Sequence, residues 1–141
     1  MADGDNKRIF KELRTRYTGG WSPPTTEYPN EKFVKPGTDS KTPAIIWARF
    51  LVVIASERAM DIGDSVKTFR VIGQLVVQLF APLGSGTMEI RGKADDLAVV
   101  FRNWCGETVR CREATINDIG DDRNGWYQIN VTISFQSDSL H

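Results

Sequence analysis

The sequence contains a single histidine, His141, and it is the last residue. Chain ends are commonly frayed, so we expect no catalytic or metal-binding role for this imidazole. Ser-His-Asp triads, Cys-His pairs and zinc sites built on imidazole all need a histidine held inside the fold. We therefore predict a protein that is not an enzyme, with no catalytic residues, no cofactor and no metal.

Cysteine is almost as scarce. Cys105 and Cys111 are separated by five residues, a spacing that fits neither a CxxC redox pair nor half of a zinc ribbon. So short a separation also leaves little room for disulfide geometry, and we expect two free thiols. With 40% hydrophobic residues, the chain is expected to fold around a core in a reducing cytoplasm, without a disulfide scaffold.

The chain also lacks net charge and long apolar runs. Its 18 basic residues equal its 18 acidic ones, whereas binding to a nucleic-acid backbone needs an excess of basic side chains. Weak long-range repulsion makes self-association easier. The longest apolar-rich runs, 45–55 and 71–82, contain Arg49, Gln74 and Gln78, and both are shorter than the ~20 residues of a membrane span. We therefore predict no membrane partner.

Two segments have the apolar period of amphipathic helices. The first is 6–17, which Gly19-Gly20 ends, and the second is 87–104. Their apolar stripes are Ile9, Phe10, Leu13 and Tyr17 in the first, and Ile90, Ala94, Leu97, Ala98, Phe101 and Trp104 in the second.

Four segments have the patterning of strands and form two predicted hairpins. The first hairpin joins a strand that begins near Ile45 to a strand over 67–81, through a turn at 60–64. Both of its faces are mostly apolar, so we expect both to be covered. The second joins strands over 107–116 and 126–136. The last strand alternates most clearly, with Ile129, Val131 and Ile133 on the face predicted to pack against the helices.

A proline-rich segment, 21–43, separates the first helix from the first hairpin. Its five prolines stand among Gly, Ser, Thr, Asn and Asp, so we predict an irregular arm. Loops of this length inside one domain are commonly functional. Trp21, Tyr28 and Phe33 lie in this arm and allow two interpretations: the rings hold the arm on its own domain, or the arm grips a neighbouring subunit.

The order helix, hairpin, helix, hairpin predicts an α+β fold. We expect one mostly antiparallel four-stranded sheet with two helices on one face, in a single domain over 1–141. The arm over 21–43 and a polar tail over 137–141 complete the prediction.

The tetrapeptide Asp-Ile-Gly-Asp occurs at both predicted hairpin turns, in 61–64 and in 118–121. We expect the two turns at the same end of the sheet, which would gather Asp61, Asp64, Asp118 and Asp121. Asp and Gly are what such turns need, and neither turn has the ligand spacing of an EF-hand. Three interpretations stay open: solvated turns, contacts with a basic partner, or a Ca²⁺ site.

The order of these features resembles the tail terminator-like proteins of long-tailed bacteriophages. The resemblance covers nearly the whole chain. It rests on the early helix, Trp21-Ser22-Pro23-Pro24, the arm with Tyr28 and Phe33, Trp47-Ala48-Arg49-Phe50, the strand 70–80, Pro82-Leu83-Gly84-Ser85-Gly86, the helix with Ala94-Asp95, and the strand 125–131.

This resemblance implies a structural virion protein without enzymatic activity. It implies a ring of copies, typically six, that caps the tail tube at its head-proximal end, stops tube growth and provides the surface for head joining. The implied partners are the tail-tube protein and the head-tail connector, with genomic DNA only passing through the lumen, and assembly would take place in the host cytoplasm. We expect contacts through Trp21, Tyr28 and Phe33, and through Asp61, Asp64, Asp118 and Asp121.

Two alternatives remain at this point. One is another small neck, minor tail or head-closure component. The other, from a different class, is a non-viral α+β domain that binds a small molecule.

Overall fold

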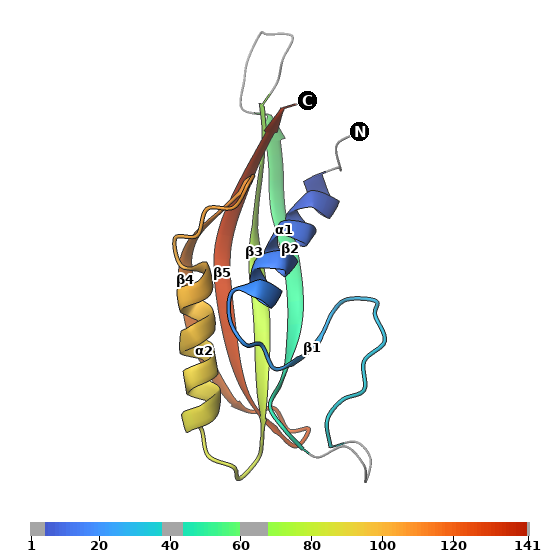
Figure 1. Ribbon diagram of the computed structural model, residues 1–141, viewed down its shortest axis with the longest axis vertical. Helices are drawn as coiled ribbons and strands as arrows, with labels where there is room; N and C mark the ends of the chain where they lie inside the picture. Colours follow the sequence, from blue (N-terminus) through green and yellow to red (C-terminus); the bar gives the residue numbers. More distant parts are fainter. Residues whose placement is uncertain (1–4, 38–43, 60–67, 141) are drawn as a thin grey trace.

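The computed structural model describes residues 5–37, 44–59 and 68–140 and shows one sheet with two helices on one of its faces (Figure 1). The α+β class and the two helices predicted from the sequence are confirmed. The elements in chain order are α1 (Asp5–Gly19), β1 (Thr25–Glu27), β2 (Trp47–Ala59), β3 (Thr68–Pro82), α2 (Met88–Phe101), β4 (Val109–Asp121) and β5 (Trp126–Leu140). Neither helix in this part of the chain has the length and apolar run that crossing a bilayer requires.

The sheet has five strands, in the order β1-β2-β3-β5-β4, and is mixed. Every pair of adjacent long strands is antiparallel. The short strand β1 runs parallel to β2, with Thr25 beside Trp47 and Glu27 beside Arg49. The predicted four-stranded sheet with a wholly irregular arm is therefore wrong in this detail. A strand of three residues next to prolines is too short to leave an alternation in the sequence.

The final strand is longer than predicted and takes up most of the expected polar tail. Ser137–Leu140 pairs with Thr68–Val71 at the start of β3. Arg70 and Asp138 lie opposite each other there, and their side chains form a two-bond ion pair, with Nε–Oδ1 2.8 Å and Nη2–Oδ2 3.1 Å. Three of the four side chains in this segment are polar, and backbone pairing together with this ion pair holds the segment in the sheet.

The second helix is shorter than predicted, and β4 is longer. α2 ends at Phe101 and not at Trp104, because the backbone beyond it bonds to the edge of β4. The Asn103 amide donates to the Arg112 carbonyl at 2.9 Å, and the Cys111 amide donates to the Trp104 carbonyl at 2.8 Å. β4 then continues to Asp121, well past the predicted end at 116.

The core lies between the helices and the facing side of the sheet. Ile9, Leu13 and Tyr17 of α1 have no exposed surface, and neither do Ile90, Leu97 and Phe101 of α2. Ile129, Val131 and Ile133 of β5 are equally buried, which confirms the alternation predicted for the last strand. Burial of this face supplies most of the favourable free energy of folding.

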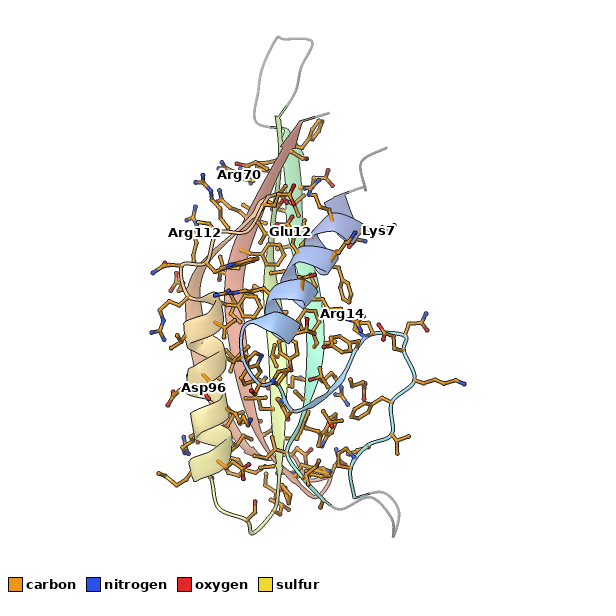
Figure 2. All side chains as sticks on the ribbon, viewed as in Figure 1. Lys7, Glu12, Arg14, Arg70, Asp96 and Arg112 are labelled. Carbon is orange, nitrogen blue, oxygen red and sulfur yellow. The ribbon has the colours of Figure 1, made fainter. Side chains whose placement is uncertain are left out.

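Polar side chains on one side of α1 fix the helix against the rest of the domain. Glu12, labelled in Figure 2, accepts a hydrogen bond from the Thr108 amide at 2.8 Å. Arg8 donates to the Thr108 hydroxyl at 2.9 Å and to the Ser137 hydroxyl at 3.0 Å. Arg16 donates twice to the Val100 carbonyl, at 3.1 and 2.9 Å. These bonds set the direction in which α1 crosses the sheet.

The other face of the sheet carries no helix of the described chain. Val53 and Ile72 on this face are 50% and 38% exposed, so the expected cover on both faces of the first hairpin is incomplete. At one end of this face, Trp47, Phe80 and Trp126 form a second buried cluster, with Phe33 of the arm packed against it.

The register of β5 can be tested with two adjacent substitutions. Val131→Asp would place a carboxylate without a partner in the core, and we expect a loss of several kcal/mol, enough to unfold a domain of ordinary stability. Thr132→Asp lies on the helix-free face, where the side chain is half-buried, and should leave the fold intact. Circular dichroism and urea denaturation measure both, and equal stability of the two variants would contradict this register.

Gly73 provides a second test, because three strands meet closely at this residue. A Cβ atom here would lie 2.4 Å from the Val53 carbonyl oxygen and 2.9 Å from Cζ of Phe135. We expect Gly73→Ala to lower the free energy of unfolding by about 1–3 kcal/mol. Gly92, inside α2, has nothing within 4 Å of such an atom, so Gly92→Ala should raise stability by about 0.5–1 kcal/mol. Changes of the same sign in urea denaturation would refute this account.

Candidate interaction surfaces

The first half of the arm packs against its own domain. The ring of Trp21 meets Tyr17 edge to face, with centroids 5.6 Å apart. Tyr28 lies 6.3 Å from Tyr17 and 5.5 Å from Phe50. The aromatic contacts of Trp21 and Tyr28 agree with the first interpretation of the arm, in which its aromatic rings hold the arm on its own domain.

An ion pair adds to this contact. The guanidinium of Arg14 lies over the Tyr28 ring, 3.7 Å from its centroid, and forms a two-bond ion pair with Glu31. Burial raises the pKa of Tyr28, and the neighbouring Arg14 opposes that rise. The pair is partly exposed, so we expect it to position the arm and to add little stability.

The second half of the arm is held by the aromatic cluster on the helix-free face. Trp47 stacks on Phe80 with centroids 4.3 Å apart, and Phe33 lies 5.4 Å from Trp47. Lys35 extends over the same cluster, its Nζ 5.4 Å from the Trp47 centroid and 5.6 Å from that of Trp126. Sequence patterns did not predict this arrangement, because the four rings come from four segments that are distant along the chain.

The arm also exposes residues other than its rings. Glu31 and Lys32 are exposed, and Val34 is 66% exposed, whereas Trp21, Tyr28 and Phe33 are half-buried. Single exposed apolar side chains are common on protein surfaces, so Val34 marks the exposed side of the arm and does not by itself identify a contact surface.

The described strand ends place the connections of the two hairpins at opposite ends of the sheet. The β4–β5 connection lies beside Pro82, since Pro82 pairs with Trp126, whereas Thr68, at the other end of β3, pairs with Leu140. The two hairpins therefore turn at opposite ends, and the expected common end is wrong. Asp61 and Asp64 lie outside the described residues.

Asp118 lies on β4 and not in a turn, and it has two partners. It accepts a hydrogen bond from the Tyr127 hydroxyl at 2.5 Å and one from Arg91 Nη2 at 2.6 Å. These donors hold the pKa of Asp118 below its ordinary value, with the Tyr127 bond the larger cause. The carboxylate thus links β4 to β5 and α2.

Asp121 and Asp122 shape the turn that follows. Asp121 accepts from the Arg123 amide at 2.7 Å, and Asp122 accepts from the amides of Asn124 and Trp126 at 2.7 and 3.0 Å. Across the described ranges, no three Asp, Glu, His or Cys side chains are grouped so as to hold a metal ion. The carboxylates of Asp121 and Asp122 therefore stabilise the β4–β5 turn.

Both cysteines are free. Burial raises the pKa of Cys111 to about 12, so this thiol stays protonated at neutral pH and is a poor nucleophile. Cys105 is exposed.

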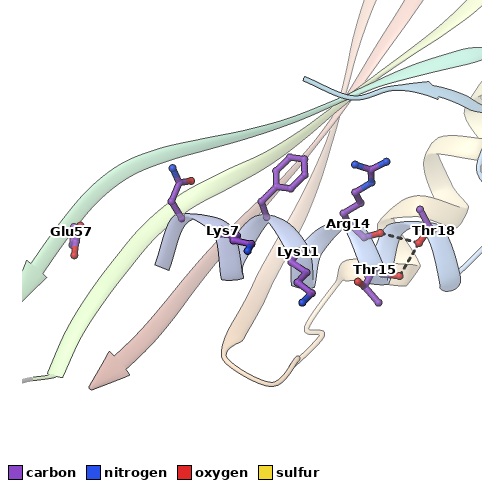
Figure 3. A pocket seen from close by; sticks show the side chains of 8 residues that line it. Lys7, Lys11, Arg14, Thr15, Thr18 and Glu57 are labelled. Atoms are coloured by element: carbon purple, nitrogen blue, oxygen red, sulfur yellow. Dashed lines mark hydrogen bonds between the residues drawn. The ribbon is translucent and has the colours of Figure 1, made fainter. Parts of the chain in front are cut away.

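A groove of about 990 Å³ runs between α1 and the end of β2 (Figure 3). Its α1 wall carries polar and basic side chains, and Glu57 stands on the β2 side. It is lined by Asn6, Lys7, Phe10, Lys11, Arg14, Thr15, Thr18 and Glu57. The groove is open along its length and holds no cluster of catalytic groups, which suits an extended segment better than a small molecule.

The anchoring of the arm can be tested at two neighbouring positions. Phe33→Ala removes the ring that packs on Trp47, and we expect proteases to cut the arm at least several-fold faster because local opening becomes easier. Val34→Ala changes an exposed side chain and should leave the cleavage rate unchanged. Limited proteolysis at equal protein concentration measures both, and equal rates would contradict the anchoring role of Phe33.

Comparisons with known proteins bear on the whole chain. The phage tail terminator protein family matches residues 8–135. Several solved structures match, one of them with a TM-score of 0.66 over 96% of each chain at 17% sequence identity, and this likeness supports the fold alone. No curated protein is significantly similar. Because the family match spans nearly all of the sequence, the chain belongs to the phage tail terminator family and is a structural protein of the bacteriophage tail.

Proposed function

We propose that this protein ends the growth of the phage tail tube by forming a ring of its own copies, six in number, on the last ring of tube protein. The family match over residues 8–135 carries this proposal. The ring would lie at the head-proximal end of the tail, with the tube protein on one side and the head-tail connector on the other. DNA would pass through its lumen.

A ring of identical subunits needs two different and complementary patches on each copy, because a contact between identical patches closes as a dimer. Two surfaces of this chain are our candidates for such patches. One is the outer side of the arm, where Val34 is exposed above the anchored Phe33. The other is the edge of β4 with Asp118 and Asp121, and β4 is at the opposite edge of the sheet from β1, the strand of the arm. Zero net charge permits close packing of copies.

The function can be tested in a phage that lacks this gene. We expect tubes that overgrow and therefore fail to join heads, because nothing stops the addition of tube protein, and a plasmid copy of the gene should restore normal length and head joining. Negative-stain electron microscopy measures tail length and head attachment. Tails of normal length attached to heads would disprove the proposal. Tails of normal length without heads would instead favour the head-closure alternative.

A further inference from the structure

The edge of β2 is open along most of its length. On one side β2 pairs with β3, whereas on the other β1 covers only Trp47–Arg49. No strand within the described ranges pairs with the rest of that edge, 50–59. An uncovered edge presents a row of backbone donors and acceptors to which another strand can add.

β4 forms the opposite edge of the sheet and is also open over part of its length. The backbone at 103–105 covers 110–112 from outside. From Glu113 to Asp121 the outer side of β4 meets no described strand. Ile119 on this stretch is 51% exposed.

The directions of these two edges suit one another. β2 is antiparallel to β3, β3 to β5, and β5 to β4, so β4 runs opposite to β2. A rotation about an axis parallel to the strands would place β4 of one copy beside β2 of the next without reversing either strand. The contact would be antiparallel and would join two different patches, which is the kind of contact that closes into a ring.

The two open edges can also pair so that their side chains alternate between the same two faces of the sheet. Irregularities interrupt β2 after Ile54 and β4 before Ala114 and after Asp118. The regular open stretches are therefore 50–54 and 114–118. Val53 pairs with Gln74, and Thr115 pairs with Thr132, on the helix-free face of the sheet. If Val53 of one copy lies opposite Thr115 of the next, the helix-free sides of the two stretches coincide. Each helix-side residue of one stretch then lies opposite a helix-side residue of the other.

The charges beside the two edges are complementary. The groove next to β2 has Lys7, Lys11 and Arg14 on its α1 wall, against Glu57. The open stretch 113–121 of β4 contains three acidic residues and no basic one. Arg14 and Asp118 already have ion partners within the chain, so we assign this complementarity to steering and orientation, and not to one new ion pair.

We propose that strand β4 of one copy adds to the open edge of β2 of the next copy, in the groove beside α1, so that antiparallel strand pairing holds the ring together. This inference rests on the proposed ring, keeps the β4 edge as one of its patches and names the open edge of β2 as the surface that receives it. Main-chain hydrogen bonds would supply the attraction, as in other cases of strand addition.

Cross-linking in assembled tails tests the pairing directly. The variant carries Val53→Cys and Thr115→Cys, with Cys105→Ser to remove the exposed native thiol, and complements a phage that lacks the gene. The two new thiols of one chain are three strand spacings apart, about 14 Å. A bis-maleimide shorter than about 10 Å therefore links them only between copies, and it tolerates a small error in register.

We expect this variant to give covalent multimers up to the size of the ring on denaturing gels. The two variants with a single new cysteine are the matched controls and should give none, because positions 53 and 115 each face the other and not themselves. Rings visible at tube ends, with both thiols reactive but no cross-linked multimers, would overturn the pairing and leave the proposed function standing. Tube ends without rings in a wild-type tail would overturn the proposed function, and the pairing with it.

A charge pair at the same two positions gives a second readout. Like charges directly opposite each other across two strands are destabilising, and opposite charges are stabilising. We expect Val53→Lys with Thr115→Lys to terminate fewer tails than Val53→Lys with Thr115→Glu, although both variants change the same exposed positions. If the two double variants terminate the same fraction of tails, the register with Val53 opposite Thr115 is wrong, even where cross-linking supports contact between the two edges.

Discussion

The ring of Phe50 is the point at which the sheet, the first helix and the arm meet. It has no exposed surface, and its neighbours are Phe10 at 5.7 Å, Tyr17 at 5.1 Å and Tyr28 at 5.5 Å between centroids. Two of these rings come from α1 and one from the arm, so burial of this one side chain places both segments on β2. The arm can then cover only the first part of that strand, and the rest of the edge stays open.

Much of the fold follows from periodicity in the sequence. The apolar stripes of both helices and the alternation of β5 are long enough to be read, and burial confirms them. The errors have physical causes that a local pattern does not contain. β1 is three residues long. The last residues of β5 are mostly polar, and backbone pairing and polar side-chain contacts hold them in the sheet. α2 stops early because Asn103 bonds to Arg112 across the fold.

The candidate surfaces were less accessible to sequence reasoning. Trp21, Tyr28 and Phe33 stood out as aromatic residues in an irregular segment, and the structure shows contacts of these rings within the chain. Composition alone cannot distinguish a side chain that packs on its own domain from one that contacts a neighbouring subunit. Asp118 stood out as a turn residue, but the structure places it in a strand with Tyr127 and Arg91. An open sheet edge has no residue signature at all, because it consists of backbone groups whose partners depend on strand order.

Open edges in a tail protein raise the question of why free copies would not pair without control. The regular open stretches span only 50–54 and 114–118, and a short isolated pairing of two strands is marginally stable in water. Bulges at the ends of these stretches limit their growth. A single contact would therefore be weak, whereas a tube end that holds several copies side by side raises their effective concentration and makes each contact intramolecular. Weak edges would thus confine ring closure to the place where a ring is needed.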